Sequence, residues 1–302
     1  MKLCKVYGLD DAHDSDPFWQ DLLLRMSPDW KERGALHRKY WEWGLGLYGL
    51  HKLGFLRPDA VALGVGAGIE WPLFYLANRV QRVVATDLYD SVHFQGLDPT
   101  VPENVERIAP FPYRAESLVF QRMDALDLSF PADTFDFAFS FSSIEHFGGH
   151  AGAALAMQEI ARVLKPGGVA CIATELILDG APHPEFFHPH EIEPWFVEAS
   201  GLEMAEPLDL HVDDALVANP VPFDYPPGFK ADTGPHTSVR MGGVTFTSIE
   251  FFLRKPRGWK PPPERVRRGY QTQMRVWQGL EQARRSLFRR GLRKLRKLIS
   301  RS

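Results

Sequence analysis

A glycine-rich turn and a later aspartate have the residue types and spacing of a nucleotide-like ligand site. Gly64, Gly66 and Gly68 alternate with two apolar residues directly after the apolar run 60–63. Glycines let the backbone turn tightly and let a ligand approach the main chain. Asp87 follows Gly68 by 19 residues, where a carboxylate can accept hydrogen bonds from both ribose hydroxyls. The glycines alone also suit a packing turn, so the aspartate carries this interpretation.

Two further sets of polar residues follow later apolar runs. Asp124 and Ala125 come after the third run, where the edge of an adenine ring would lie. Glu145 and His146 come after the fourth run, 135–141. An unperturbed imidazole titrates near neutrality, at about 6.5. His146 is therefore the candidate general base, which would take a proton from a hydroxyl group of a substrate. Packing or capping is the competing role for His146, and Glu145 either orients this ring or faces solvent.

Histidines and acids also gather in a later segment that prolines interrupt. The members of this group are His183, His188, His190, Glu191 and Glu193. A divalent metal is conceivable there, since some members of related families use a divalent cation, but a proline-interrupted loop with several histidines is more often only a loop. We therefore expect no metal site, and contact with a substrate is the alternative.

Short apolar runs alternate with helical segments over the middle of the chain. The expected strands are 60–63, 82–86, 118–123, 135–141 and 169–174, followed by a weaker pair at 202–208 and 244–253. Helical segments are expected at 70–80, 153–164 and 191–200, and two aromatic helical segments precede the first strand. This alternation predicts βαβ units, a parallel sheet and helices on both faces. Ligands of such sheets bind beyond the carboxyl ends of the strands, where the polar residues above fall.

A nicotinamide-binding domain is the main competitor, because it also combines glycines with a following acid. Its fingerprint requires Gly-x-Gly-x-x-Gly. Counted from Gly64 the last position is Ile69, and counted from Gly66 it is Trp71. Neither register fits, which argues against hydride transfer.

The ordered set of motifs resembles the class I S-adenosylmethionine-dependent methyltransferases. The set runs from the glycine turn through Asp87, Asp124 and the segment 135–140 to Leu164-Lys165-Pro166-Gly167-Gly168. The resemblance is strong over residues 58–178 and weak through the later strands. It implies a Rossmann-like, seven-stranded, mostly parallel α/β sheet with helices on both faces, plus N-terminal helices and a C-terminal helical tail.

The resemblance also implies roles for individual residues. The three glycines and Ser140 would face the methionine part of S-adenosylmethionine, Asp87 the ribose, and Asp124 with Ala125 the adenine. The family usually has an acid two positions before the first glycine, where this chain has Ala62. Glu70 is the candidate substitute, although a carboxylate also suits a helix start.

The implied reaction is direct methyl displacement onto a small-molecule, glycan or lipid-linked acceptor, at oxygen or nitrogen. Two other hypotheses stay open. The absent acid favours a binding protein that has lost catalysis, and a basic tail favours a nucleic-acid methyltransferase. Against the second, no Asn/Asp-Pro-Pro-aromatic tetrapeptide follows the fourth strand.

Charge divides the chain of 302 residues into an acidic body and a basic tail. Residues 254–302 hold 17 Lys and Arg against two acids, a net charge of +15, whereas residues 1–253 have a net charge of −18. The tail follows Pro261-Pro262-Pro263 and spaces leucines between arginines like a basic amphipathic helix. Such a helix suits an anionic membrane surface better than nucleic acid here, and packing on the protein body is the competing role.

Two cysteines, Cys4 and Cys171, make neither a disulfide framework nor a zinc motif. With no apolar run of signal-peptide or membrane-span length, we expect a cytoplasmic protein, peripheral at a membrane if the tail binds one. The predicted division is an N-terminal helical segment and lid at 1–55, a cofactor-binding domain at 56–255 and a basic tail at 256–302.

Overall fold

A ten-stranded sheet forms the centre of the protein in the computed structural model, which describes residues 1–302 except 34, 90–97, 181, 224–235 and 300–302. Only the backbone is described at 33, 281 and 283–299. The strand order is β4-β3-β2-β5-β6-β10-β9-β8, and β1 and β7 also pair with β10. The strands are β1 (Lys5–Val6), β2 (Val61–Val65), β3 (Arg82–Asp87), β4 (Leu118–Arg122), β5 (Phe135–Phe141), β6 (Leu164–Ile177), β7 (Glu203–Met204), β8 (Val221–Pro222), β9 (Val239–Met241) and β10 (Val244–Arg254).

The central strands confirm the predicted α/β fold. Strands β2 to β6 run parallel, and β10 pairs with β6 in the antiparallel sense. Strand order reverses between β2 and β5, which places the ligand-binding crevice of such sheets at the carboxyl ends of these two strands. The expected count of seven strands is wrong. The three additional strands, β1, β8 and β9, have two or three residues each, too few to show a periodicity.

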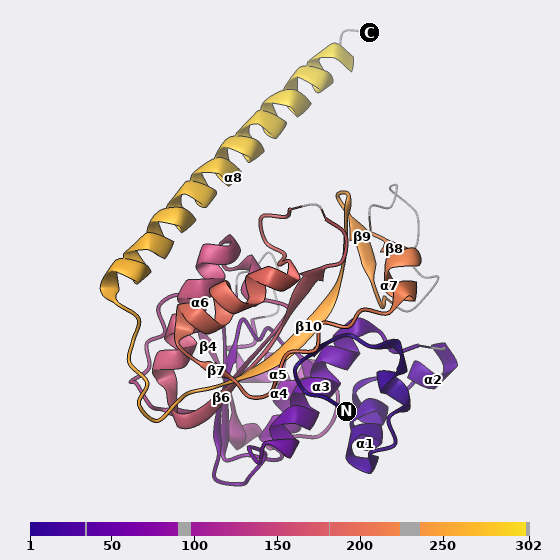
Figure 1. The fold of residues 1–302 in the computed structure, drawn as a ribbon, viewed down its shortest axis with the longest axis vertical. Helices are drawn as coiled ribbons and strands as arrows, with labels where there is room; N and C mark the ends of the chain where they lie inside the picture. Colours follow the sequence, from indigo (N-terminus) through magenta and orange to yellow (C-terminus); the bar gives the residue numbers. More distant parts are fainter. Residues whose placement is uncertain (34, 90–97, 181, 224–235, 300–302) are drawn as a thin grey trace.

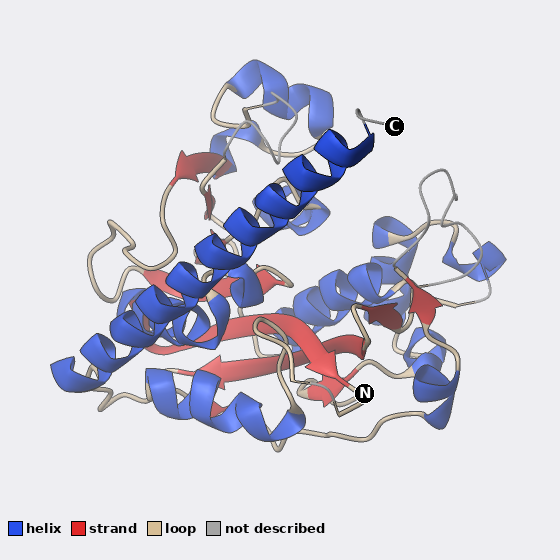
Figure 2. Ribbon diagram, turned by 90° about the horizontal axis from the view of Figure 1, so that it is seen from above, coloured by secondary structure: helices blue, strands red, loops and turns tan. Residues whose placement is uncertain are grey.

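Helices cover both faces of the sheet (Figure 2). The helices are α1 (Pro17–Met26), α2 (Trp30–Arg33), α3 (Arg38–Lys52), α4 (Trp71–Ala77), α5 (Pro102–Ile108), α6 (Gly149–Val163), α7 (Asp214–Ala218) and α8 (Glu264–Ile299). Short 3-10 turns are η1 (Leu9–His13), η2 (Ala115–Ser117), η3 (Ile144–His146) and η4 (Pro189–Glu191), and η5 (Glu193–Glu198) is a π-helix. Helix α8 extends away from the body over most of its length (Figure 1).

Close packing explains why α3 forms despite its glycines. The second of the two aromatic helical segments expected before the first strand forms two helices, α2 and α3. A Cβ at Gly49 would lie 2.1 Å from the Phe252 ring, and one at Gly46 would lie 2.5 Å from the Phe141 ring. The glycines therefore let α3 approach β5 and β10 closely, and this packing outweighs their low helix propensity.

The end of α6 and the start of β6 are closer together than the sequence suggests. The segment 164–168 lies between the expected helix at 153–164 and the expected strand at 169–174. Helix α6 does end at Val163, but Leu164 already pairs with Phe135. The register then shifts and resumes where Val169 pairs with Phe137, so the intervening residues form an irregularity within β6.

Candidate active site

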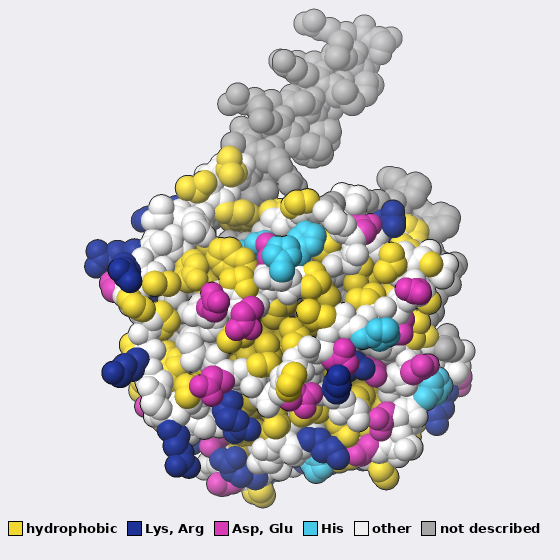
Figure 3. Space-filling view, viewed as in Figure 1, with side chains coloured by type: hydrophobic (Ala, Val, Ile, Leu, Met, Phe, Trp, Pro, Cys, Tyr) yellow, Lys and Arg dark blue, Asp and Glu magenta, His cyan; other side chains and the backbone are white. Residues whose placement is uncertain are grey.

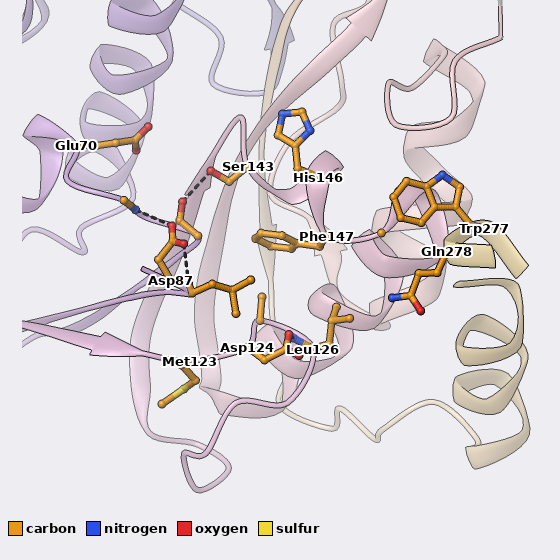
Figure 4. Close-up of a pocket in the computed structure, with 15 residues that line it drawn as sticks. Glu70, Asp87, Met123, Asp124, Leu126, Ser143, His146, Phe147, Trp277 and Gln278 are labelled. Atoms are coloured by element: carbon orange, nitrogen blue, oxygen red, sulfur yellow. Dashed lines mark hydrogen bonds between the residues drawn. The ribbon is translucent and has the colours of Figure 1, made fainter. Parts of the chain in front are cut away.

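One cavity of about 600 Å³ lies at the carboxyl ends of the central strands (Figure 4). It brings together six of the eight predicted cofactor residues and the predicted base. Its lining comprises Gly66, Gly68, Glu70, Asp87, Leu88, Met123, Asp124, Ala125, Leu126, Ser143, His146, Phe147, Gly148, Trp277 and Gln278. The prediction that these motifs meet at one edge of the sheet is confirmed.

The glycine turn has the backbone geometry that its residues allow. Gly66 and Gly68 adopt φ values of 59° and 49°, a region that other residues enter at a cost. A Cβ at Gly66 would lie 2.6 Å from the Phe147 ring. The Ser143 hydroxyl donates to the Gly66 carbonyl at 2.7 Å, and the Gly68 N–H donates to Asp87 Oδ2 at 3.1 Å. The turn is thus held from two strand ends.

Gly64 and Ser140 lie outside the lining of this cavity. Gly64 lies within β2, where a Cβ would meet Ala67 Cβ at 2.7 Å, so its glycine is needed for packing of the turn. Ser140 lies within β5 and is fully buried. Ser143, three residues later, faces the cavity instead, because Ser142 adopts a left-handed φ of 49° as the chain leaves β5.

Asp87 and Asp124 present carboxylate oxygens to the cavity. Asp87 Oδ1 accepts the Leu88 N–H at 2.7 Å, and Asp124 Oδ1 accepts the Leu126 N–H at 2.9 Å. An ionised carboxylate offers about four acceptor positions, so each side chain keeps capacity for a ligand. Backbone donors fix both carboxylates in place before any ligand arrives.

Glu70 and Lys39 form an ion pair at the opposite end of the cavity from Trp277 (Figure 4). Lys39 Nζ lies 2.8 Å from Glu70 Oε1 and also donates to the Phe141 carbonyl at 2.6 Å. Glu70 Oε2 is buried and has no hydrogen bond of ordinary geometry within the described residues, and the Trp43 side chain is a donor close to this carboxylate. Burial raises the pKa of Glu70. An incompletely paired carboxylate on a cavity wall fits the ammonium group of a ligand.

Comparison with known proteins identifies the fold family. Residues 63–172 match the family described as methyltransferase domain. This segment, about a third of the chain, is similar to a methyltransferase domain. The resemblance implies S-adenosylmethionine as the cofactor, and Glu70 and the two aspartates offer acceptor oxygens for its ammonium, ribose and adenine groups.

The fold of the methyltransferase domain has solved counterparts. One is a protein from Galdieria sulphuraria assigned as a sarcosine dimethylglycine methyltransferase, with 16% identity, a TM-score of 0.50, and coverage of 72% of this chain and 85% of that one. A second is a protein from Bacillus halodurans assigned as a methyltransferase, with 18% identity, a TM-score of 0.47, and coverage of 70% and 98%. A third is Haemonchus contortus phosphoethanolamine N-methyltransferase 2 in complex with S-adenosyl-L-methionine, with 20% identity, a TM-score of 0.42, and coverage of 61% and 44%. A search of curated protein sequences finds no match.

His146 lies at the rim of the cavity of this methyltransferase domain, between two carboxylates. Its Nδ1 is 3.4 Å from Glu185 Oε2, and its Nε2 is 4.0 Å from Glu145 Oε1. The Glu185 contact raises the pKa of His146 to about 8, although partial burial opposes the change. Glu185 therefore orients the ring through Nδ1 and leaves Nε2 as the atom able to accept a proton.

Glu145 is fully buried beneath this ring and does not line the cavity. Burial raises its pKa to about 7, and the neighbouring Glu175 adds to the effect. Thr174 donates to Glu145 Oε2 at 3.1 Å, while Oε1 makes no hydrogen bond within the described part of the chain. Of the two predicted orientations of Glu145, solvent exposure is wrong, because η3 turns this side chain into the core.

A buried charge network joins α3 to the sheet behind the cavity. Arg38 Nη1 lies 2.8 Å from Glu175 Oε1 and 3.2 Å from Glu42 Oε1. Lys39 Nζ lies 3.2 Å from Glu42 Oε2, so the two cations of α3 serve three carboxylates including Glu70. The pKa of Glu42 is lowered despite its burial because both cations are close. This network, which fixes the position of Glu70, has no local signal in the sequence.

The predicted histidine segment forms part of the surface near the domain's cavity. His183 stacks on Phe186, with ring centroids 4.0 Å apart, and His188 stacks on His190 at 5.4 Å. Histidine side chains stand among apolar ones on the face seen in Figure 3. Among the residues that the structure describes, no group of three or more potential ligands could hold a metal ion.

Several cavity residues were not predicted from the sequence. Ser143 and Phe147 adjoin the predicted pair Glu145 and His146, so proximity along the chain was an available signal. Trp277 and Gln278 come from α8, about 130 residues later, and no local pattern connects them with the methyltransferase domain. None of the helices in the described part of the chain has the length and apolar character that a membrane span requires.

Proposed function

We propose that the protein transfers the methyl group of S-adenosylmethionine by direct displacement to a small-molecule, glycan or lipid-linked acceptor, at oxygen or nitrogen. The observation that carries this proposal is the single cavity that holds the glycine turn, Asp87 and Asp124 with His146 at its rim. The bound cofactor supplies an activated methyl group. The protein's part is alignment of the acceptor with that group, and proximity alone contributes several kcal/mol to such reactions.

The cavity residues divide into cofactor and acceptor roles in this proposal. Asp87 holds the ribose hydroxyls, and Asp124 with Ala125 holds the adenine. Glu70 holds the ammonium group, because Ala62 stands where the family usually has an acidic residue. This substitute weakens the case for an inactive binding protein. His146 accepts the proton of a hydroxyl or ammonium acceptor through Nε2, with Glu185 holding the ring.

Calorimetry with S-adenosylmethionine and S-adenosylhomocysteine tests the cofactor assignment. We expect both to bind, and Asp87→Ala to weaken binding at least 100-fold, because two hydrogen bonds to a charged group contribute about 1.5–3 kcal/mol each. Asp59→Ala is a matched control, since Asp59 is an exposed aspartate outside the cavity. Absence of binding to wild-type protein would refute the proposal, and binding without methyl transfer to any extract would favour an inactive protein.

We further propose that the basic tail at 256–302 contacts an anionic membrane surface. Helix α8 extends from the body (Figure 1), and its sequence combines leucines with a strong positive charge. Attraction of a basic helix to anionic lipid weakens as salt screens it. Sedimentation with phosphatidylglycerol vesicles should carry the protein down at low salt, and phosphatidylcholine vesicles should not. Protein that stays in solution with both lipids would exclude this contact.

The N-terminal segment, residues 1–55, is proposed to cover the acceptor. In support, Lys39 of α3 contacts Glu70, which lines the cavity. Tyr40, Trp43 and Trp71, beside this ion pair in the chain, form an aromatic group with ring centroids 5.5–6.2 Å apart. Aromatic side chains next to a reactive centre can enclose an acceptor and exclude water. Tyr40→Ala, at a partly buried member of this group, should then raise the acceptor KM more than it changes cofactor affinity.

A further inference from the structure

Helix α8 does not only extend into solvent, because its first turns pack against the methyltransferase domain. This part of α8 contacts α6 and the turn that precedes it. Trp277 and Gln278 belong to the lining of the cofactor cavity, on the side away from Glu70 and Asp87 (Figure 4). A cavity wall is thus built by residues that the family's motifs do not include.

Two glycines at the start of α6 make room for this wall. Gly148 and Gly149 have φ values of 115° and 67°. A Cβ at Gly148 would lie 3.1 Å from Met274 Cγ, and one at Gly149 would lie 2.8 Å from the Pro184 carbonyl and 3.3 Å from Trp277 Nε1. Larger residues at either position would crowd the space where α8 approaches α6.

Arg267 connects the same part of α8 to the loop that carries Asp124 by a hydrogen bond. Arg267 Nη1 lies 3.1 Å from the buried Glu159, and Nη2 donates to the Leu126 carbonyl at 3.3 Å. Tyr270 adds a ring contact to Trp195 at 5.6 Å between centroids. Leu126 itself lines the cavity, so α8 and the loop of Asp124 are held as one wall.

Trp277 carries the feature that points to a ligand. Its Nε1 is buried beside Gly149, and the six-membered ring is the part that faces the cavity (Figure 4). Adenine has a flat face, and aromatic side chains bind bases by stacking. The neighbouring Gln278 amide can donate and accept.

We propose that α8 is a cofactor-binding element of this protein, with Trp277 and Gln278 contacting the adenine half of the bound cofactor. The inference rests on the proposed assignment of Asp124 to adenine and extends it to a part of the chain outside the matched family segment. The basic tail then begins on the helix that closes the cofactor cavity.

The test compares full-length variants by calorimetry with S-adenosylhomocysteine, a readout that needs no acceptor. Trp277→Ala should weaken binding about tenfold or more, the effect of losing a base-stacking partner. Trp277→Phe keeps a stacking ring and should lose less, and Gln278→Ala should lose a few-fold. Val276→Ala is the matched control, because Val276 is an exposed neighbour on the same helix and does not line the cavity.

The outcomes separate this inference from the proposed function. Wild-type affinity in both Trp277→Ala and Gln278→Ala would overturn the inference while the cofactor assignment stands. Failure of the wild-type protein to bind would overturn both. If Trp277→Ala does not fold, Trp277→Phe and Gln278→Ala decide, since Gln278 is exposed.

Discussion

The contact between Glu185 and His146 makes a quantitative prediction about protonation. Glu185 Oε2 lies 3.4 Å from His146 Nδ1 and raises the pKa of His146 from its ordinary 6.5 to about 8. Glu185→Gln removes the negative charge and keeps the shape of the side chain. We expect the pKa of His146 to fall back toward 6.5 in this variant.

The free energy of unfolding should also depend on the protonation of His146. A histidine whose pKa is raised in the folded protein stabilises it below pH 6.5, and this contribution is lost as the pH rises through about 8. The shift of the His146 pKa from 6.5 to about 8 corresponds to at most about 2 kcal/mol in the free energy of unfolding. Because 56% of the His146 side chain is exposed, solvent screening reduces this to about 1 kcal/mol or less. Glu185→Gln should therefore abolish the pH dependence that this pair gives to the free energy of unfolding.

Nuclear magnetic resonance of histidine ring shifts against pH measures the pKa directly, and His146→Gln assigns the signal. Asp213→Asn is the control: it removes the charged partner of the exposed His211, whose Nε2 lies 3.6 Å from Asp213 Oδ1, and should leave the pKa of His146 unchanged. Once an acceptor is known, the rise of methyl transfer with pH should move with the measured pKa, because only neutral imidazole accepts a proton. A His146 pKa that is equal in wild type and Glu185→Gln would refute this account.

Three other perturbations have defined outcomes. Gly66→Ala and Gly54→Ala both place a Cβ at positive φ, but only the first meets an obstacle, the Phe147 ring; urea unfolding should show about 1 kcal/mol lost at Gly54 and clearly more at Gly66. The wild-type protein should lose stability as the pH rises from about 4.5 to about 7, because the buried Glu145 has a raised pKa and its ionisation opposes folding. Glu145→Gln should not show this loss. Equal pH profiles of the two proteins would contradict this. Glu70→Gln should weaken S-adenosylhomocysteine binding at constant fold, as measured by calorimetry, and unchanged affinity would exclude Glu70 as the ammonium partner.

The sequence pattern of the basic tail predicts its helix but not the contacts that this helix makes with the rest of the protein. The spacing of leucines and arginines predicts a helix, and residues of α8 up to Ile299 are helical. The pattern gives no sign that Trp277 meets Gly149, because that contact depends on how α8 docks on α6. The same holds for Lys39 and Glu70, which are far apart in sequence and adjacent in the fold.

The sequence by itself determined the central strands and the group of residues at their ends. Strand β5 was predicted with the bounds that the structure has, and Gly66, Gly68, Asp87 and Asp124 meet because parallel strands end at one edge of the sheet. Local patterns report the burial and spacing of neighbouring residues, so they reveal such elements well. Only the tertiary structure decided which side chain after β5 faces the cavity, that β1, β8 and β9 extend the sheet, and that α8 closes the cofactor site. Those features depend on backbone turns, short pairings and long-range docking, to which no periodicity in the sequence corresponds.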